Sequence, residues 1–512
     1  MGYKIIELKL PTGYSDKELK ERISKECGSR DVTWQIETKS LDARKKGNIH
    51  WLMRIAITSQ DIKGDGPEQG SPLEISYAKR NKRVVITGSG PAGFFAAYVL
   101  QKAGFDTIIL ERGAEVDKRA AGIANFEHTG EFSPVANYSF GEGGAGTFSD
   151  GKLTSRSKHI SPERDFFLEE YIDAGAPEEI RYMTHPHVGS DNLKNIVKKL
   201  RTKYTALGGE IRFEKTLREM AIKDGKIKEA ITEDETIPAD YFIVAPGHSS
   251  YETYRMLIAM GVQFRTKGFA LGCRAEHLQS DINRAQWGVE GLPGVKAAEY
   301  RLASDGDGKH PVYSFCMCPG GIVVPAATYK HINIVNGMSF YGRDGRFSNA
   351  ACVAGVHPDE LAGRKVTALE ALQWLENLEA SFFDFAKGYQ APFCSISDFL
   401  REKEPHKLPE TSYPLGLTPA PLWKLLPPAV SASIRQGLAD FCRKIKGYEK
   451  GNLLGLESKT SSPVQVIREQ NGLCTGFANL FLAGEGSGYS GGIVSSAADG
   501  IKIAMNILKE GN

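Results

Sequence analysis

Hydrophobic and polar residues alternate with period two near the start of the chain. This pattern predicts strands at Ile5–Leu10, Val32–Thr38 and His50–Thr58. Between the first two, Ser15 marks a helix start, and Leu19, Ile23 and Cys27 recur at helical spacing. The sequence therefore predicts a small β-α-β-β module over residues 1–80. Its last part, residues 59–74, is rich in Gly, Asp, Pro and Ser and indicates a linker.

Longer periodic segments follow. Apolar residues at helical spacing predict helices at 191–208, 366–387, 428–446 and Val494–Leu508. Short apolar runs, typical of central strands in a parallel sheet, occur at Arg83–Thr87, Ile108–Leu110, Asp240–Ala245 and Leu480–Ala483. Further strands are expected at Glu210–Phe213, Val312–Phe315 and Ile332–Asn336. The chain thus reads as α/β.

Composition narrows the function classes. A chain of 512 residues has room for roughly two to four domains. Its 64 basic and 62 acidic residues give a net charge of +2, so no nucleic-acid or membrane partner is expected. The eight cysteines show no zinc-type spacing, and no metal site is expected. Without an apolar signal segment or a span of about 20 apolar residues, the prediction is a cytoplasmic protein that acts on a small molecule.

The most specific local pattern is a dinucleotide fingerprint. The first apolar strand runs directly into Gly88-Ser89-Gly90-Pro91-Ala92-Gly93, a helix follows, and the next strand ends in Glu111. Gly88 permits a sharp turn, Gly90 leaves room for a pyrophosphate, and Gly93 lets helix and strand pack closely. The helix N-terminus attracts the phosphates, and Glu111 can accept hydrogen bonds from ribose hydroxyls. An isolated GxGxxG could be a mere turn, but its context predicts a Rossmann-type domain.

An acid at position 111 argues against a 2′-phosphate, hence against NADP at this site. The fingerprint alone cannot choose between FAD and NAD. Three further segments bear on that choice: the glycine-rich Phe140–Leu153, the strand and turn Tyr241–Ser249, and the glycine-dense Asn479–Ile493.

With these segments the chain resembles the two-domain FAD oxidoreductases of the glutathione-reductase-like superfamily. More narrowly, it resembles the uncharacterised bacterial family often called NAD(FAD)-utilising dehydrogenases. The resemblance implies FAD as the cofactor. Glu485 stands where the superfamily usually has Asp, which keeps the carboxylate for the ribityl chain. Gly492 and Ile493 would open the last helix toward the flavin, where a helix N-terminus stabilises negative charge.

The cofactor-binding residues implied in this way fall into four groups. They are Gly88, Ser89, Gly90, Pro91, Ala92, Gly93, Glu111 and Arg112; Gly143, Gly144, Ala145, Gly146 and Thr147; Leu217, Ala245 and Gly247; and Gly484, Glu485, Gly491, Gly492 and Ile493.

Catalytic residues cannot be chosen from the sequence, but four candidates stand out. Lys152 could place a cation near the flavin or form a surface salt bridge. Cys316 and Cys318 could be a redox-active or nucleophilic pair, or small residues at a tight strand end. His248 could be an acid–base group, as could His185 and His187. Arg468 could bind an anionic substrate or pair with a carboxylate. Three polar groups, Arg274, Glu276 and His277, are expected after a strand.

The predicted fold is a Rossmann-type FAD-binding domain with an inserted α+β substrate domain and an N-terminal module in the style of half a ferredoxin-like fold. The expected boundaries are 1–80, 81–270, 271–450 and 451–512. The predicted function is a FAD-dependent oxidoreductase that moves hydride between a small molecule and flavin N5. No second GxGxxG marks an NAD(P) domain, although NAD(P)H could still dock as a donor. A flavin-dependent RNA-modifying enzyme and a flavin-binding redox sensor remain alternatives.

Overall fold

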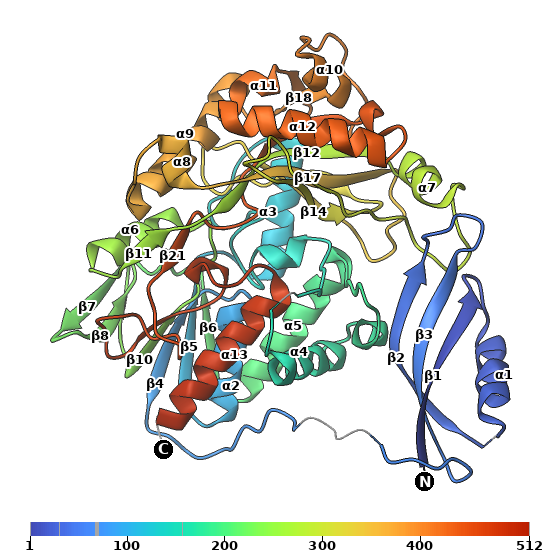
Figure 1. Ribbon diagram of the computed structural model, residues 1–512. Helices are drawn as coiled ribbons and strands as arrows, with labels where there is room; N and C mark the ends of the chain where they lie inside the picture. The colour runs from blue at the N-terminus through green and yellow to red at the C-terminus, as the bar shows by residue number, and fades with distance from the viewer. Residues whose placement is uncertain (1, 30, 67–70, 156, 511–512) are drawn as a thin grey trace.

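A computed structural model describes residues 2–29, 31–66, 71–155 and 157–510 (Figure 1). The chain begins with a small module of β1 (Gly2–Pro11), α1 (Asp16–Cys27), β2 (Thr33–Asp42) and β3 (His50–Ser59). Its strands form an antiparallel sheet in the order β1-β3-β2. Every second residue of β1 and β3 packs against Leu19 and Ile23 of α1, which confirms the predicted β-α-β-β order. Of the predicted linker, residues 67–70 lie outside the described part.

A parallel sheet in the order β22-β10-β4-β5-β6 follows. Its strands are β4 (Arg83–Thr87), β5 (Asp106–Glu111), β6 (Glu210–Phe213), β10 (Tyr241–Val244) and β22 (Leu480–Leu482). All neighbouring pairs run parallel, as the wholly apolar runs predict. Because β22 comes from near the end of the chain, this sheet is assembled from two distant segments.

The two faces of the parallel sheet have different covers. Helices α2 (Pro91–Lys102), α4 (Ser161–Asp173), α5 (Ser190–Ala206) and α13 (Ile493–Glu510) cover one face (Figure 1). An antiparallel meander of β7 (Glu219–Lys223), β8 (Lys226–Ile231) and β9 (Thr236–Pro238) covers the other. Side chains alternate between these covers, so that Val84 faces the helices and Val85 the meander.

A second, larger sheet has the order β13-β14-β17-β12-β20-β18-β19. Its strands are β12 (Phe269–Leu278), β13 (Ala303–Ser304), β14 (Val312–Cys318), β17 (Phe347–Val356), β18 (Ala391–Ser395), β19 (Leu417–Pro419) and β20 (Asn452–Glu457). Helix α12 (Pro428–Lys444) packs on it, and α9 (Ala368–Ala386) contributes to the same core. The sheet extends past the predicted boundary at 450, because β20 pairs with both β12 and β18.

The remaining elements are short or peripheral. They are α3 (Val116–Thr129), α6 (Tyr251–Ala259), α7 (Gln279–Trp287), α8 (Pro358–Ala362), α10 (Ile396–Arg401), α11 (Leu422–Leu425), β11 (Phe264–Thr266), β15 (Ile322–Pro325), β16 (Val335–Met338) and β21 (Val464–Val466). The strand expected at 332–336 thus begins three residues later, at Val335. None of the helices in the described ranges combines the length and apolar character that crossing a bilayer requires.

The N-terminal module docks against the rest of the chain through backbone as well as side chains. The amide of Lys39 donates to the carbonyl of Tyr182 at 2.8 Å, and the amide of Thr184 donates to the carbonyl of Lys39 at 3.1 Å. The Lys39 ammonium lies over the rings of Tyr14 and Trp51. Lys39 therefore contributes to packing within the module through its side chain and to docking through its backbone.

Candidate functional site

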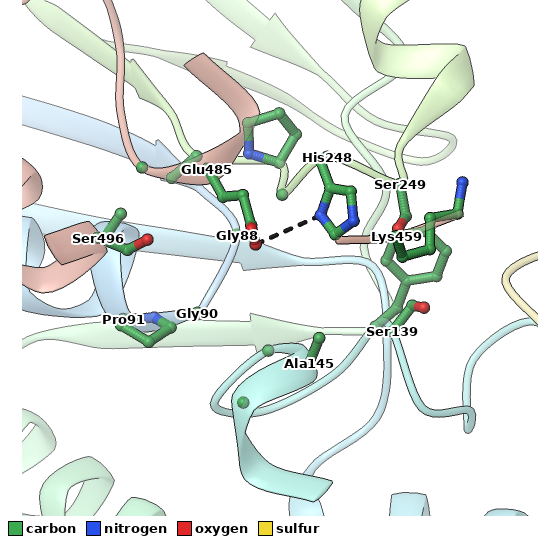
Figure 2. A pocket seen from close by; sticks show the side chains of 18 of the residues that line it. Gly88, Gly90, Pro91, Ser139, Ala145, His248, Ser249, Lys459, Glu485 and Ser496 are labelled. Atoms are coloured by element: carbon green, nitrogen blue, oxygen red, sulfur yellow. Dashed lines mark ion pairs between the residues drawn. The ribbon is translucent and has the colours of Figure 1, made fainter. Parts of the chain in front are cut away.

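A cavity of about 260 Å³ lies at the carboxyl ends of the parallel strands (Figure 2). Thr87, Leu110, Ala245 and Ala483 line it where β4, β5, β10 and β22 end or have just ended. Open α/β sheets bind ligands at this edge. The opposite wall comes from the larger sheet, so the cavity has one side from each sheet.

Two glycines of the fingerprint are required by backbone packing. Gly88 has φ of +97°, and a Cβ there would lie 2.2 Å from the carbonyl oxygen of Ala245. A Cβ on Gly93 would lie 2.0 Å from the carbonyl oxygen of Gly88, so strand and helix touch at this point. Gly90 is the N-cap of α2 and makes no side-chain cap, which leaves the first amides of the helix without a side-chain partner.

Glu111 ties the loops at the strand ends together. One carboxylate oxygen accepts from the amide and hydroxyl of Ser89, both at 2.8 Å. The other accepts from the amides of Gly113 at 2.8 Å and Gly141 at 3.0 Å. Glu111 and Arg112 both line the cavity, whereas Ser89 lies behind it. The carboxylate thus holds the fingerprint loop against the second glycine-rich loop.

That second loop approaches the fingerprint closely. Gly144 has φ of +67°, and a Cβ there would lie 3.0 Å from the Cα of Gly90. Gly144, Ala145 and Gly146 line the cavity together with Lys152. Thr147 faces away and donates to the carbonyl of Glu142 at 3.1 Å, and Gly143 borders a separate small void.

The C-terminal segment closes the same side of the cavity. Gly484, Glu485, Gly492 and Ile493 line it, as does Leu217 from the segment after β6. Gly491 does not line it, although a Cβ there would meet no atom within 4 Å. Gly247 and Gly492 both have positive φ, and a Cβ on either residue would also meet no atom within 4 Å.

His248 and Glu485 meet in the cavity (Figure 2). Nδ1 of His248 lies 3.3 Å from a carboxylate oxygen of Glu485. Nε2 of the same ring is buried and has no hydrogen-bond partner among the described residues. A buried polar atom without a partner is costly, and because His248 lines the cavity, a bound ligand can supply that partner.

These features fit a bound FAD. The uncapped α2 amides suit its pyrophosphate, the open space at Gly247 and Gly492 suits a large planar ligand, and the partnerless nitrogen of His248 offers a polar contact.

The opposite wall carries both predicted cysteines. Cys316 and Cys318 line the cavity near the end of β14, where the strand loses register with β17. Cys316 has φ of +41°. Its side chain is exposed to the cavity but surrounded by protein, and this burial raises the pKa of its thiol to about 12. Burial also raises the pKa of Cys318. Both thiols are therefore poor nucleophiles in this state.

Lys152 belongs to a buried charge network. Its ammonium lies 3.1 Å from a carboxylate oxygen of Asp150 and donates to the carbonyl of Met317. Arg343 binds the same carboxylate at 2.6 Å. Burial opposes the charge on Asp150, but Lys152 and Arg343 more than offset it and hold the pKa of this carboxyl well below its usual range. The surface salt bridge considered for Lys152 is thus a partly buried ion pair at the cavity wall.

Two further ion pairs support the wall. Arg274, fully buried, lies 2.8 Å from Glu457 and donates to the carbonyl of Cys316 at 2.7 Å. Burial raises the pKa of Glu457 despite this partner. Lys459 pairs with the buried Glu379 at 2.7 Å. Glu457 and Lys459 both line the cavity.

Other predicted candidates lie elsewhere. Arg274, Glu276 and His277 are inside β12 rather than after a strand, because their buried polar side chains hide the strand from a hydrophobicity pattern. His185 pairs with Glu299 at 2.7 Å outside the cavity. Arg468 pairs with the carboxylate of Asp499 at 2.7 Å, which is the second of the two roles considered for it.

Some cavity residues escaped the sequence analysis. Ser250, Thr253 and Ser496 lie at or near the beginnings of α6 and α13. Phe315, exposed to 38%, follows the pattern of its strand and carries no chemical signature. Two of these residues had a signal in the sequence, because Ser250 lies close to the turn 245–248 and Ser496 lies close to Gly491 and Gly492.

Comparison with known proteins agrees with this geometry. Residues 81–267 match the family described as "FAD binding domain", and residues 268–460 match "FAD-dependent protein, C-terminal domain-like". An uncharacterized protein of Clostridium beijerinckii is 38% identical over 510 residues, which cover 96% of this chain and 94% of that protein.

Similarity to solved structures is weaker. The L-proline dehydrogenase from P. horikoshii aligns over 85% of this chain and 95% of its own, with 10% identity and a TM-score of 0.40. CtdE in complex with FAD aligns over 84% of both chains, with 12% identity and a TM-score of 0.35. At these values the likeness assigns no reaction to the chain.

The two family matches are contiguous, and the C. beijerinckii relative matches nearly the full length of the chain. The chain therefore belongs to a family of FAD-dependent flavoproteins that includes the C. beijerinckii protein, and its cofactor is FAD.

Proposed function

We propose that the protein is a FAD-dependent oxidoreductase that transfers hydride between a small-molecule substrate and flavin N5. The observation that carries this proposal is the two-sided cavity. One side has the glycine loops and the uncapped N-terminus of α2 that suit a dinucleotide, and the other is built by a different sheet. A flavin on the first side would face a substrate held by the second. This arrangement is in keeping with the two-domain FAD oxidoreductases that the sequence resembles.

Bound FAD supplies the redox chemistry itself. The chain's own residues bind and orient. The backbone amides at the start of α2 and the loop Gly144–Gly146 hold the cofactor from one edge. Phe315 of the second sheet and Asn336 of β16 contribute to the substrate side, which makes residues 271–450 the substrate domain of this proposal.

The charged groups of the substrate side are already paired within the protein. Lys152 binds Asp150, Lys459 binds Glu379, and Glu457 binds Arg274. Such pairs hold their side chains in fixed positions and leave little uncompensated charge for a substrate. The proposed substrate therefore has a partly apolar body, which fits the exposed face of Phe315.

An anaerobic reduction series tests the proposal. The purified holoprotein is mixed with NADH, NADPH, and panels of hydroxy acids, amines and unsaturated acids, while the flavin absorbance is followed. We expect at least one donor to bleach the flavin and one acceptor to restore it, with repeated turnover. A flavin that no donor reduces, or that is reduced once without turnover, would instead favour a flavin-binding sensor.

A cytoplasmic location belongs to the same proposal. All eight cysteines are free thiols, including pairs close in sequence such as Cys316 and Cys318. Free thiols suit a reducing compartment. Retention of eight titratable thiols in protein isolated under thiol-trapping conditions would support this location, and a disulfide formed in the cell would oppose it.

A further inference from the structure

His248 is a histidine of the cavity wall, and one of its two ring nitrogens has no partner. The residue is 9% exposed, and Nδ1 lies 3.3 Å from Glu485. Nε2 is buried and lacks a hydrogen-bond partner within the described part of the chain. Figure 2 shows the ring between Glu485 and Lys459, at the cavity wall. The carboxylate fixes one nitrogen, which leaves the other available to a ligand.

The position of the ring in the fold tells which ligand it faces. His248 follows the end of β10, and Glu485 follows the end of β22. These two strands are hydrogen-bonded neighbours, with Val244 opposite Leu482. Both residues therefore stand on the nucleotide-binding edge of the parallel sheet. Cys316 and Asn336, by contrast, come from strands outside this sheet.

We propose that His248 is a cofactor-binding residue whose Nε2 contacts the polar linker between the flavin ring and the adenosine of FAD, with Glu485 as the group that orients the imidazole. This linker offers ribityl hydroxyls and phosphate oxygens. A neutral ring with its proton on Nδ1 accepts from a hydroxyl through Nε2, and a protonated ring donates to a phosphate. Either contact satisfies the nitrogen that the protein leaves without a partner.

The charges around the ring are consistent with a polar ligand there. Glu485 and Glu457 are both close enough to interact with His248, and Lys267 interacts with Glu485. The proposal needs FAD in this cavity but no particular reaction, so it is independent of the identity of the substrate.

Two amide variants separate the ring nitrogens. In His248→Gln the side-chain amide reaches the position of Nε2, whereas in His248→Asn it reaches only that of Nδ1 and keeps the contact with Glu485. Release of FAD from each purified holoprotein is followed by the rise of flavin fluorescence on dilution. We expect release to be about tenfold faster for His248→Asn and within about threefold of the wild type for His248→Gln, the size of one hydrogen bond to a polar or charged group.

His185→Asn is the matched control, because His185 also pairs with a glutamate but lies outside the cavity. Its FAD release should equal that of the wild type. Thermal unfolding of all variants reports whether the fold is kept. The ³¹P resonances of bound FAD distinguish the two parts of the linker: they shift in His248→Asn if Nε2 contacts a phosphate and stay in place if it contacts the ribityl chain.

Two results would overturn the assignment. Unchanged FAD release from a folded His248→Asn protein would leave Nε2 free for the substrate. Equally fast release from the Gln and Asn variants would mean that ring shape, rather than Nε2, matters. Failure of the proposed oxidoreductase function would appear separately, as a wild-type flavin that no donor reduces.

Discussion

Burial governs the titration of many side chains around the cavity. It raises the pKa of the thiols of Cys316 and Cys318 and of the carboxyl of Glu457. Where a group is held charged, as Asp150 is, nearby cations more than offset its burial. The pKa of each of these side chains thus depends on its surroundings in the folded protein, which the sequence does not reveal. Steric roles are easier to predict: those of Gly88 and Gly93 follow from the fingerprint alone and are present in the structure.

Cys316 provides a prediction at this scale. Because its pKa is raised to about 12, little thiolate is present near pH 8. Alkylation of Cys316 by iodoacetamide should therefore be on the order of a hundredfold slower in the folded protein than after denaturation. Mass spectrometry of the labelled peptide over time measures this ratio. Equal rates in the two states would show that the fold does not suppress the thiolate of Cys316, and a faster rate in the folded protein would show an activated thiol.

His187 provides a second prediction at the scale of single residues. Burial, with a contribution from Arg343, lowers the pKa of His187 to about 4, below the ordinary value near 6.5. Between these pH values the unfolded chain binds more protons, so the contribution of His187 to stability is complete above about pH 6.5 and is lost as the pH falls to 4. The loss is on the order of 3 kcal/mol.

Denaturant unfolding of the wild type and of His187→Gln at several pH values measures this contribution. The difference in unfolding free energy between the two proteins should narrow as the pH falls from 6.5 to 4. A difference that is constant with pH would place the titration of His187 at its ordinary value.

At the scale of elements, the strands of the parallel sheet were the easiest to predict. They are short and almost wholly apolar because both faces are covered. The strand expected before Arg274 extends further than predicted, because Arg274, Glu276 and His277 lie within β12 and are buried through partners that are distant in sequence. A hydrophobic pattern predicts only apolar core positions. It does not predict buried polar residues whose partners lie far away in the sequence.

The contact between α2 and α13 is tight enough to test. A Cβ on Gly500 would lie 2.0 Å from the carbonyl oxygen of Ala92. Gly500→Val should push the two helices apart, cost about 1–3 kcal/mol and weaken FAD binding, since both helix N-termini border the cavity. Lys509→Ala, at an exposed position of the same helix, is the control. Equal melting temperatures and FAD contents for the two variants would contradict this helix contact.

At the scale of the molecule, the cavity exists only because distant segments meet. The parallel sheet joins strands near residues 83 and 480, and the second sheet includes β20 beyond the boundary expected at 450. The sequence motifs predicted most residues of the cofactor side, because the glycines there are required by the local course of the backbone. The pairing of charges on the substrate side, such as that of Lys459 with Glu379, required the three-dimensional arrangement.

The flavin content of the purified protein tests the central claim most directly. A Cβ on Gly90 would lie 3.7 Å from Gly144, an ordinary contact, so Gly90→Leu should fold while its longer side chain enters the cavity. We predict a yellow wild type with one FAD for each chain, a yellow Gly491→Ala control, and a colourless but folded Gly90→Leu protein. A folded wild type that is colourless and takes up no added FAD, or a Gly90→Leu protein with full FAD content, would contradict the account.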